Sequence, residues 1–521
     1  MPGARHSSPA VSAPGLLYPP GMENTAARSH RRAARPRPAP APEILHALEL
    51  PGRMNAGDAL FWYAESALPI LRPIIAGLDI LDCRPAAARM EEGIEAALAV
   101  VPRLRQRVAE APLLVGLPEW VDDPHFDFSY HVRHISLPPP GSMRELLDLT
   151  ATLFAAPLDR QRPLWEAYWI DGFDHARAAF FLKLHHSVVD GVGSMALQNA
   201  LTQPTRGAHP PRVVGTRRRH RQPRAGVAQR LADLAADNAA ASLRLARDAA
   251  AVPARLLTDP GDGIDQMQRA LRGVRGLVAD LLAPTVVDPL DRGCSGLSRR
   301  FDVMTIPLPR LQRIGAALEV TINDVVLTAL AGALGAYHRH RHVHVETLNC
   351  MVPINLRAAG ETHTLGNRVG IFTVRLPLAE RRPAERLALV TRQTHAAKND
   401  RRGAAGPLAL QGLALLPGFA MRWIARRALG KYNLACTNVP GLARPRYMAG
   451  ARIEAIYPFA SVVEGTPLVM ALMSYAGVMH VGFDTDPEAI PDPERIHALY
   501  DAALTELEAI AGIKPARLRR R

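Results

Sequence analysis

The sequence predicts an α/β protein with two subdomains joined by a helical linker. In both halves of the chain, short strands rich in β-branched residues, such as 369–375, alternate with amphipathic helices, such as 324–337. Between the halves, residues 203–297 are charged and rich in Ala, Arg and Leu, with prolines that would break this segment into several helices. A chain of 521 residues with 48% hydrophobic content is long enough to fill two hydrophobic cores.

These observations divide the chain into five parts. Residues 1–50 are rich in Pro, Ala and Arg without apolar periodicity, which predicts a disordered basic extension. Residues 51–202 form the predicted N-terminal subdomain and residues 298–512 the C-terminal one, with the helical charged linker at 203–297 between them. Residues 513–521 form a basic tail. We see no secretory signal near the N-terminus.

The stretch that says most about function begins with a predicted buried strand, 178–184, and continues into two adjacent histidines. Successive residues of an extended chain face opposite sides, so His185 and His186 should have different roles. Imidazole is the side chain whose ordinary pKa lets it accept a proton near neutral pH and return it, as transfer of an acyl group to an alcohol requires. We therefore expect His186 to be a general base, with His185 packing or hydrogen bonding beside it.

The residues after the histidines favour a tight turn. Asp190 and Gly191 would end the strand, and Ser194 could cap a helix that begins at Met195. We interpret Asp190 as a structural anchor that pairs with an arginine; the alternative is a carboxylate that orients the imidazole. Two other interpretations are an ordinary turn beside a core histidine and a zinc site. Zinc is disfavoured because adjacent histidines on a strand diverge and no Cys or Glu lies at ligand spacing.

The pattern His-His-x-x-x-Asp-Gly at 185–191 resembles the hallmark of the bacterial wax ester synthase/diacylglycerol acyltransferase family. Further motifs similar to those of this family follow one another in the family's order over about residues 50 to 510. They lie at 55–61, 120–127, 131–133, 157–166, 321–327, 353–357, 365–367, 437–441, 474–475 and 491–492. This ordered series is far more specific than any single motif. One departure is Thr437, where the family more often has Ser, and this change keeps the hydroxyl.

The resemblance implies two subdomains related to chloramphenicol acetyltransferase that meet at a central tunnel. It also implies an acyl-CoA-dependent O-acyltransferase that forms triacylglycerol from diacylglycerol, or wax esters from fatty alcohols. Carried over motif by motif, it assigns catalytic roles to His185, His186, Asp190, Gly191 and Asn323, and substrate binding to Asp324, Thr437 and Asn438. Asn323 would help to stabilise the oxyanion of the tetrahedral intermediate, and helix or turn capping is the alternative for the asparagines.

Two alternatives to this function stay open. The first is a catalytically silent relative that coats lipid surfaces, although the intact histidine motif favours an enzyme. The second is an acyltransferase for a specialised alcohol or amine acceptor, as in condensation domains that carry the same motif. Acceptor choice depends on the shape of the tunnel, which the sequence does not reveal.

The charge balance favours an anionic partner. The net charge is +14 and the sequence pI is about 10.2, with basic runs at 217–224 and 517–521. An anionic membrane or lipid-inclusion surface fits these runs, whereas no nucleic-acid-binding motif is present, so nucleic acid is not an expected partner. The segment 408–427 ends in a Trp beside arginines, which is typical of an interfacial segment and equally of a buried helix with a basic end.

The remaining features suggest a protein that does not cross a membrane. No apolar run reaches the roughly 18 to 20 residues that a spanning helix needs. Cys83, Cys294, Cys350 and Cys436 are too scattered for a disulfide framework or a metal site and read as reduced thiols. We expect a cytoplasmic protein, peripherally associated with membranes or lipid inclusions, that uses acyl-CoA as co-substrate and no bound cofactor. The sequence does not indicate an oligomeric state.

Overall fold

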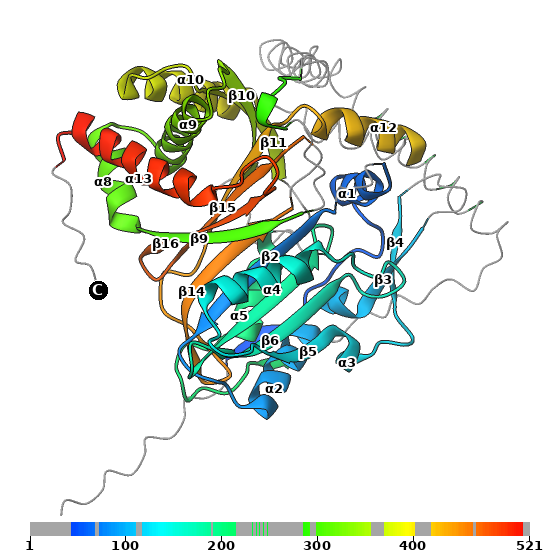
Figure 1. Ribbon diagram of the computed structural model, residues 1–521. Coiled ribbons are helices and arrows are strands. Elements are labelled where there is room, and N and C mark those ends of the chain that lie inside the picture. Colours follow the sequence, from blue (N-terminus) through cyan, green and yellow to red (C-terminus); the bar gives the residue numbers. More distant parts are fainter. Residues whose placement is uncertain are drawn as a thin grey trace, which may run out of the picture. The chain divides into compact units, whose positions relative to one another are not determined.

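The computed structural model describes residues 43–67, 72–110, 117–188, 191–214, 285–291, 298–355, 369–401, 418–461 and 465–513, with five isolated positions between 232 and 247. Within the compact unit Pro40–Arg521, two six-stranded mixed sheets carry helices on their faces (Figure 1). The predicted α/β class with two subdomains is confirmed. The central tunnel stays a prediction.

The first sheet belongs mainly to the N-terminal half, in the order β13-β14-β2-β7-β6-β5. Its strands are β2 (Ile74–Leu81), β5 (Val132–Ser136), β6 (Trp165–Phe173), β7 (Arg177–His185), β13 (Tyr447–Met448) and β14 (Ala451–Ala460). The helices of this half are α1 (Ala56–Ala67), α2 (Ala87–Val100), α3 (Phe128–His131), α4 (Met143–Ala155) and α5 (Gly191–Leu201). A short 3-10 helix (Pro102–Arg105) leads into the small sheet of β3 (Gln106–Ala109) and β4 (Glu119–Asp122).

The second sheet has the order β11-β10-β12-β15-β16-β9. Its strands are β9 (Arg300–Pro307), β10 (Thr347–Asn355), β11 (Val369–Pro377), β12 (Leu434–Pro440), β15 (Leu468–Tyr475) and β16 (Val478–Thr485). The helices of this half are α8 (Leu308–Ala317), α9 (Ile322–His340), α10 (Pro383–Arg401), α12 (Gly418–Leu429) and α13 (Pro493–Ile510). Helix α9 packs against α10 and α13 and is buried along most of its length, so it forms the centre of this core (Figure 1).

One strand of the C-terminal half crosses into the first sheet. β14 pairs antiparallel with β2, where Tyr457 lies opposite Leu78, and Ser461 Oγ then donates to the Ile74 carbonyl oxygen at 3.2 Å. Tyr475 of β15 fixes the start of this strand, since its hydroxyl accepts from the Arg446 backbone N–H at 2.8 Å and donates to a β14 carbonyl oxygen. The predicted division of the chain at residue 298 therefore does not separate the two sheets.

Aromatic stacking and an ion pair also join the two sheets. Phe301 of β9 stacks on Phe459 of β14, with ring centroids 3.9 Å apart, and contacts Phe154 of α4. Arg144 of α4 pairs with Asp302 of β9 at 2.9 Å. The two sheets thus share a packed boundary in which α4, β9 and β14 meet.

The ends of two predicted segments need correction. β1 (Ile44–His46) lies inside the predicted disordered extension and pairs parallel with β8 (Arg212–Val214), which lies inside the predicted helical linker. Pairing of strands more than 160 residues apart leaves no local sequence signal, which explains the error. Three predictions fall outside the described residues. They are the disorder of residues 1–42, the helices in the rest of the linker apart from the positions named above, and the basic tail after residue 513.

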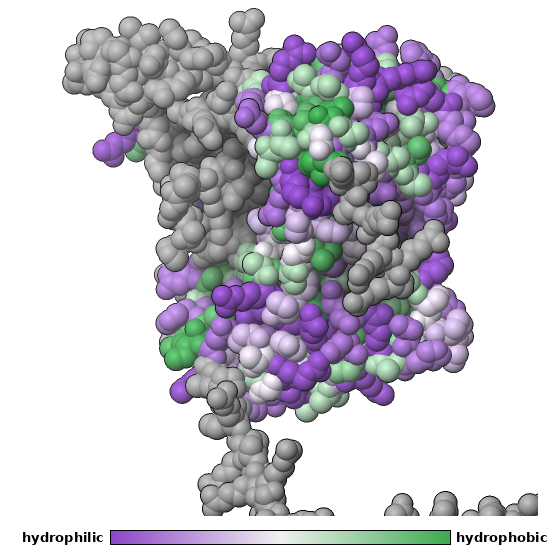
Figure 2. Space-filling model, turned by 90° about the vertical axis from the view of Figure 1, so that its left-hand side faces the viewer, coloured by the Kyte–Doolittle hydropathy of each residue, from purple (hydrophilic) through white to green (hydrophobic). Residues whose placement is uncertain are grey.

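No single helix among the described residues is long and apolar enough to cross a membrane. Helices α8 and α9 together meet the length and composition requirements, but a bend of 97° separates them. The apolar residues of α9 are explained by its place in the second core. On the side of the molecule that carries α8 and α13, hydrophilic residues are spread over the visible surface (Figure 2).

Candidate active site

The histidine pair stands at the end of β7, where backbone hydrogen bonds fix the chain. The predicted strand is confirmed, and β7 ends at His185. The His185 N–H donates to the Leu164 carbonyl oxygen at 3.0 Å, and the His186 N–H donates to the Pro73 carbonyl oxygen at 2.7 Å. A turn follows directly, closed by the Val188 N–H to the His185 carbonyl oxygen at 2.9 Å. The two imidazoles therefore project from a corner that is held on both sides.

The turn after the histidines differs from the predicted one. Helix α5 begins at Gly191, so Ser194 lies within the helix and does not cap it. A turn already occurs at residues 186–188, and Gly191 and Gly193 both lie within α5. Asp190 and the side-chain surroundings of Gly191 lie outside the described residues, so the roles assigned to these two residues stay predictions.

His185 is buried and held as a neutral ring. Its Nδ1 lies 2.6 Å from Ser187 Oγ and accepts from the Ser187 backbone N–H at 3.2 Å. Because a backbone N–H can only donate, the ring proton is assigned to Nε2. Burial, with smaller effects from His186 and Arg160, lowers the pKa of His185 to about 3. A ring that stays neutral at physiological pH and has one nitrogen engaged is a structural support for the corner.

Helix α1 covers the other side of His185. Glu65 Oε2 lies 4.0 Å from His185 Nε2, and Trp62 meets the imidazole edge-on. Arg160 lies over the Trp62 ring, 3.5 Å from its centroid, and reaches Glu65 Oε2 at 3.4 Å. Burial raises the pKa of Glu65, and the nearby Arg160 opposes that rise. These side chains connect His185 to the predicted 157–166 motif, which supplies Arg160.

His186, the first residue after β7, is partly exposed, whereas His185 is buried. Its ring stacks on Phe61 of α1, with centroids 4.2 Å apart and planes inclined by 20°. Its Nδ1 has no hydrogen-bond partner among the described side chains and backbone groups. Burial lowers the pKa of His186, so the imidazole is neutral near pH 7 and able to accept a proton.

Asn323 and Asn438 are brought together by the fold. Asn438 Nδ2, on β12, donates to Asn323 Oδ1, at the N-terminus of α9, at 2.7 Å. This bond uses the oxygen of Asn323 and leaves its amide N–H groups as the available donors. Thr437 is partly buried on the same strand, and no contact between this pair and the histidines is recorded within the described part of the chain.

Asp324 has a structural place. Its side chain is fully buried, and it forms a capping box with Thr321 at the start of α9. One carboxylate oxygen accepts from the Thr321 backbone N–H at 2.9 Å, and the other accepts from Thr394 Oγ1 at 2.5 Å. The geometry thus favours helix capping for Asp324 rather than the predicted contact with substrate, because both oxygens are already engaged.

The sequence pattern did not assign roles to the side chains that surround the histidines. Phe61 ends the recognised 55–61 motif, and Glu65 lies one helical turn further on the same face of α1. Arg160 occupies a variable position of the 157–166 motif. A helical projection of residues 56–67 would have shown that Phe61 and Glu65 share a face, but not that this face meets β7.

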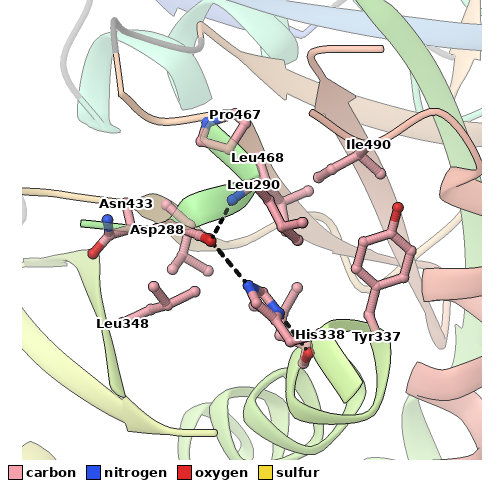
Figure 3. A pocket seen from close by; sticks show the side chains of 11 residues that line it. Asp288, Leu290, Tyr337, His338, Leu348, Asn433, Pro467, Leu468 and Ile490 are labelled. Atoms are coloured by element: carbon pink, nitrogen blue, oxygen red, sulfur yellow. Dashed lines mark hydrogen bonds and ion pairs between the residues drawn. The ribbon is translucent and has the colours of Figure 1, made fainter. Parts of the chain in front are cut away.

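A small pocket lies elsewhere, in the C-terminal half (Figure 3). At its wall, His338 Nε2 lies 3.1 Å from a carboxylate oxygen of the buried Asp288. Its other lining residues are Leu290, Leu334, Tyr337, Leu348, Asn433, Leu434, Pro467, Leu468 and Ile490. None of the predicted site residues lines it. We interpret it as a packing defect where residues 285–291 dock onto α9.

The comparisons with known proteins agree with the motif series. A family model for the wax ester synthase/diacylglycerol acyltransferase catalytic domain matches residues 54–326, and a model for the C-terminal domain of the same family matches residues 365–508. Together they cover more than half of the chain. The chain belongs to this family.

Relatives of this wax ester synthase/diacylglycerol acyltransferase protein are similar over most of their length. A protein of Mycobacterium tuberculosis named as a diacylglycerol O-acyltransferase is 31% identical over 477 residues, which are 88% of this chain and 100% of the relative. The O-acyltransferase WSD of Acinetobacter baylyi is 30% identical over 403 residues, which are 76% of this chain and 83% of the relative. The protein is thus an acyltransferase enzyme of this family.

Solved structures place the fold. The wax ester synthase/diacylglycerol acyltransferase from Marinobacter aquaeolei matches with a TM-score of 0.57 and 24% identity, over 88% of this chain and 100% of that one. A starter condensation domain of rhizomide synthetase, solved with C8-CoA, matches with a TM-score of 0.52 and 13% identity, over 88% and 94%. Both matches confirm the α/β architecture that the motif series implied.

Proposed function

We propose that this acyltransferase transfers a fatty acyl group from acyl-CoA to the hydroxyl of diacylglycerol or of a long-chain alcohol, with His186 as general base. The observation that carries the proposal is the position of His186. This residue directly follows the fixed strand β7, and its ring stacks on Phe61. Burial lowers its pKa, so the ring is neutral and can accept a proton near pH 7. The name of the Mycobacterium tuberculosis relative supports diacylglycerol as acceptor, and the name of the Marinobacter aquaeolei protein supports both diacylglycerol and the alcohol of a wax ester. The condensation domain solved with C8-CoA supports a CoA thioester as donor.

In the proposed reaction, His186 removes the proton from the acceptor hydroxyl as its oxygen attacks the thioester carbonyl carbon. A tetrahedral intermediate forms, and its negative oxygen is stabilised by amide N–H groups of Asn323. The C–S bond then breaks, and the CoA sulfur takes the proton from the imidazolium. An ester and free CoA result, His186 returns to its neutral form, and neither an acyl-enzyme nor a bound cofactor takes part.

His185 and His186 divide the work in this scheme. His185 stays neutral because burial lowers its pKa to about 3, and its contacts with Ser187 and Glu65 orient the corner. His186 is thereby free to exchange a proton with substrate. Asp190 is proposed to anchor the turn. Thr437 and Asn438 are proposed to line the acceptor side of the site.

The test is ester formation by purified full-length protein. Radiolabelled palmitoyl-CoA is supplied with dioleoylglycerol or with hexadecanol, and the neutral lipid products are separated. His186→Ala should lower the rate by at least about a hundredfold, the loss expected when a general base is removed. The matched control is His340→Ala, an exposed histidine at the end of α9, which should retain full activity.

Two outcomes would point elsewhere. Full activity in His186→Ala would exclude this histidine as the base. Absence of ester with both acceptors, while an alcohol or amine of another class accepts the acyl group, would assign the protein to the specialised-acceptor alternative.

A further inference from the structure

Helix α12 exposes two large aromatic side chains. Phe419 is 68% exposed and Trp423 is 66% exposed, and at 3.6 residues per turn they lie one turn apart on the same face. Of the Phe, Tyr and Trp side chains that the structure describes, only these two are mostly exposed. Leaving two such side chains in water on one face indicates that something covers them.

Basic side chains accompany the two aromatic ones. Arg426 continues the face that carries Phe419 and Trp423, while Arg422 and Arg427 lie on either side of it. The helix Gly418–Leu429 contains no acidic residue. Aromatic side chains flanked by arginines are the combination by which a helix lies in the interface of an anionic bilayer, with rings among the headgroups and guanidinium groups on phosphates.

The opposite face of α12 is packed against α1. Helix α12 lies beside α1 (Figure 1). Ala425 and Leu429 of α12 form a buried cluster with Ala64 of α1, and the partly buried Leu60 packs against it. The core-facing side of α12 is thus already packed on α1. The aromatic face is a second, separate face of the same helix. Helix α1 is also the element that holds the histidine pair, through Phe61 and Glu65.

We infer that the exposed face of α12, defined by Phe419, Trp423 and Arg426, is the docking surface of this protein for an anionic lipid bilayer. The inference deepens the proposed function and rests on it, because diacylglycerol and long-chain alcohols reside in lipid. It places the lipid surface on a helix that packs directly on α1, so acceptor lipid is drawn from the side of the molecule nearest the histidines.

A second copy of the chain fits this surface poorly. In a two-fold symmetric dimer through this face, α12 would meet its own copy. Arg422 and Arg426 would then face the same two arginines of the other copy. The helix Gly418–Leu429 offers no acidic residue across such a contact, so the like charges destabilise it. The charge of the helix thus favours an anionic lipid surface over self-association.

Intrinsic fluorescence gives a direct test, because the chain has five tryptophans and the other four are buried. Trp62, Trp120, Trp165 and Trp169 are exposed by 2%, 1%, 2% and 8%. Phosphatidylcholine vesicles that contain phosphatidylglycerol should shift the emission of full-length protein to shorter wavelength, and bromine-labelled acyl chains should quench it. Trp423→Phe should keep vesicle binding and abolish the quenching.

Affinity for the vesicles is measured by flotation. Phe419→Ser should weaken binding by roughly tenfold, the effect expected when one large aromatic ring no longer leaves water. The matched controls are Ile44→Ser and Ile510→Ser, which replace exposed apolar side chains on other elements and should bind as the wild type does. If the protein binds vesicles but the fluorescence of Trp423 neither shifts nor is quenched, other basic segments carry the binding and the inference is overturned. Loss of a dimer in Phe419→Ser would also overturn it and assign the face to a protein contact.

An activity arm separates this inference from the proposed function. Phe419→Ser with Trp423→Ser should lose ester formation with dioleoylglycerol in vesicles, yet retain wild-type rates with a short-chain, water-soluble alcohol. Equal rates for wild type and variant with the vesicle acceptor would overturn the docking role. Quenching of Trp423 in a protein that esterifies neither acceptor would contradict the proposed function while supporting the docking surface.

Discussion

Phe61 and His186 form a stacked ring pair, with centroids 4.2 Å apart and planes inclined by 20°. The two residues come from different elements, α1 and the end of β7. Stacking restricts rotation of the imidazole and keeps water from one of its faces. The orientation of the proposed base therefore depends on the position of a helix as well as on its own strand.

We predict that Phe61→Ala lowers kcat by about tenfold, because a base that can rotate spends less time in the reactive geometry. The same change admits water to the ring. Burial lowers the pKa of His186, so hydration should raise this pKa toward its ordinary value. Since the base acts in its neutral form, the acid limb of the pH–rate profile should move to higher pH. Phe61→Leu, which keeps an apolar cover, should show a smaller move, and identical profiles for both variants would contradict the stacking role.

Glu65 is predicted to be a positioning residue for the histidine corner. Its carboxylate lies 4.0 Å from His185 Nε2, beyond hydrogen-bond length, so its charge acts on the N–H dipole of a neutral ring. Glu65→Gln keeps the shape and removes the charge, and it should lower kcat by roughly threefold to tenfold with KM unchanged. The control is Glu110→Gln, which removes the other carboxylate near Arg160 at a half-exposed site. Glu110→Gln should have wild-type kinetics. Equal effects of the two changes would show that Glu65 acts through its ion pair with Arg160 and not through His185.

Asn323 is predicted to donate to the oxyanion, because Asn438 already occupies its oxygen. Asn323→Asp preserves an acceptor for Asn438 and abolishes the donor, so it should lower kcat by about a hundredfold, as loss of an oxyanion donor does. Asn438→Ala removes only the orienting bond and should cost about tenfold. Steady-state kinetics with palmitoyl-CoA and hexadecanol checks both values. A larger loss of kcat in Asn438→Ala than in Asn323→Asp would make Asn438 the oxyanion donor and Asn323 the residue that orients it.

Lys183 should matter for stability rather than for chemistry, although it stands three residues before His186. Its fully buried ammonium donates to the Leu153 and Ala156 carbonyl oxygens at the end of α4, at 2.9 and 2.6 Å, and faces Glu166 at 3.4 Å. Lys183→Met removes the donor from both carbonyl oxygens and the ammonium from Glu166, which keeps its bond from the Tyr168 hydroxyl. This variant should lower the free energy of unfolding by about 3 kcal/mol in urea titrations. Asp148→Asn, which breaks the exposed pair with Arg144, should change it by less than about 0.5 kcal/mol.

Local pattern was sufficient for the strands and helices but not for their distant partners. The apolar run before the histidines predicted β7, and the β-branched run at 369–375 predicted β11 (Val369–Pro377). The pairing of β14 with β2 joins residues more than 370 positions apart. Nothing in either strand specifies that partner. A close approach between β12 and β15 likewise appears only in three dimensions, at Gly441, where a Cβ would lie 2.2 Å from the Ser474 carbonyl oxygen.

For the site, the sequence placed the histidines correctly at a strand end and left their surroundings open. Different roles for His185 and His186 are expected from strand alternation. The structure buries His185 and leaves His186 partly exposed, although both imidazoles contact α1. The contributions of Phe61, Glu65 and Arg160 depend on how α1 packs against β7, which is a tertiary property. Asp324 shows the converse, because a capping pattern of Thr three residues before Asp was readable in the sequence while the family motif suggested a contact with substrate.

His480 provides a prediction about acid stability. Its ring is buried on β16 near Tyr457 and Tyr475, with centroids 5.4 and 6.1 Å away. Neither ring nitrogen has a hydrogen-bond partner among the described groups. Burial lowers the pKa of His480 to about 4, whereas an unfolded histidine has a pKa of about 6.5. Below pH 6.5 the unfolded chain therefore binds a proton that the folded chain does not, and stability falls as the pH falls toward 4.

His480→Phe removes this proton uptake and keeps an aromatic ring between the tyrosines. At about 1.4 kcal/mol for each pH unit below 6.5, the variant should gain about 2 kcal/mol relative to the wild type when the pH is lowered from 7.5 to 5. Urea unfolding of both proteins at both pH values measures this double difference, in which the titration of all other groups cancels. His340→Phe, at an exposed position, should show no such gain. A double difference near zero for His480→Phe would mean that His480 is protonated in the folded protein at pH 5. The buried site would then have to contain a hydrogen-bond acceptor for the imidazolium.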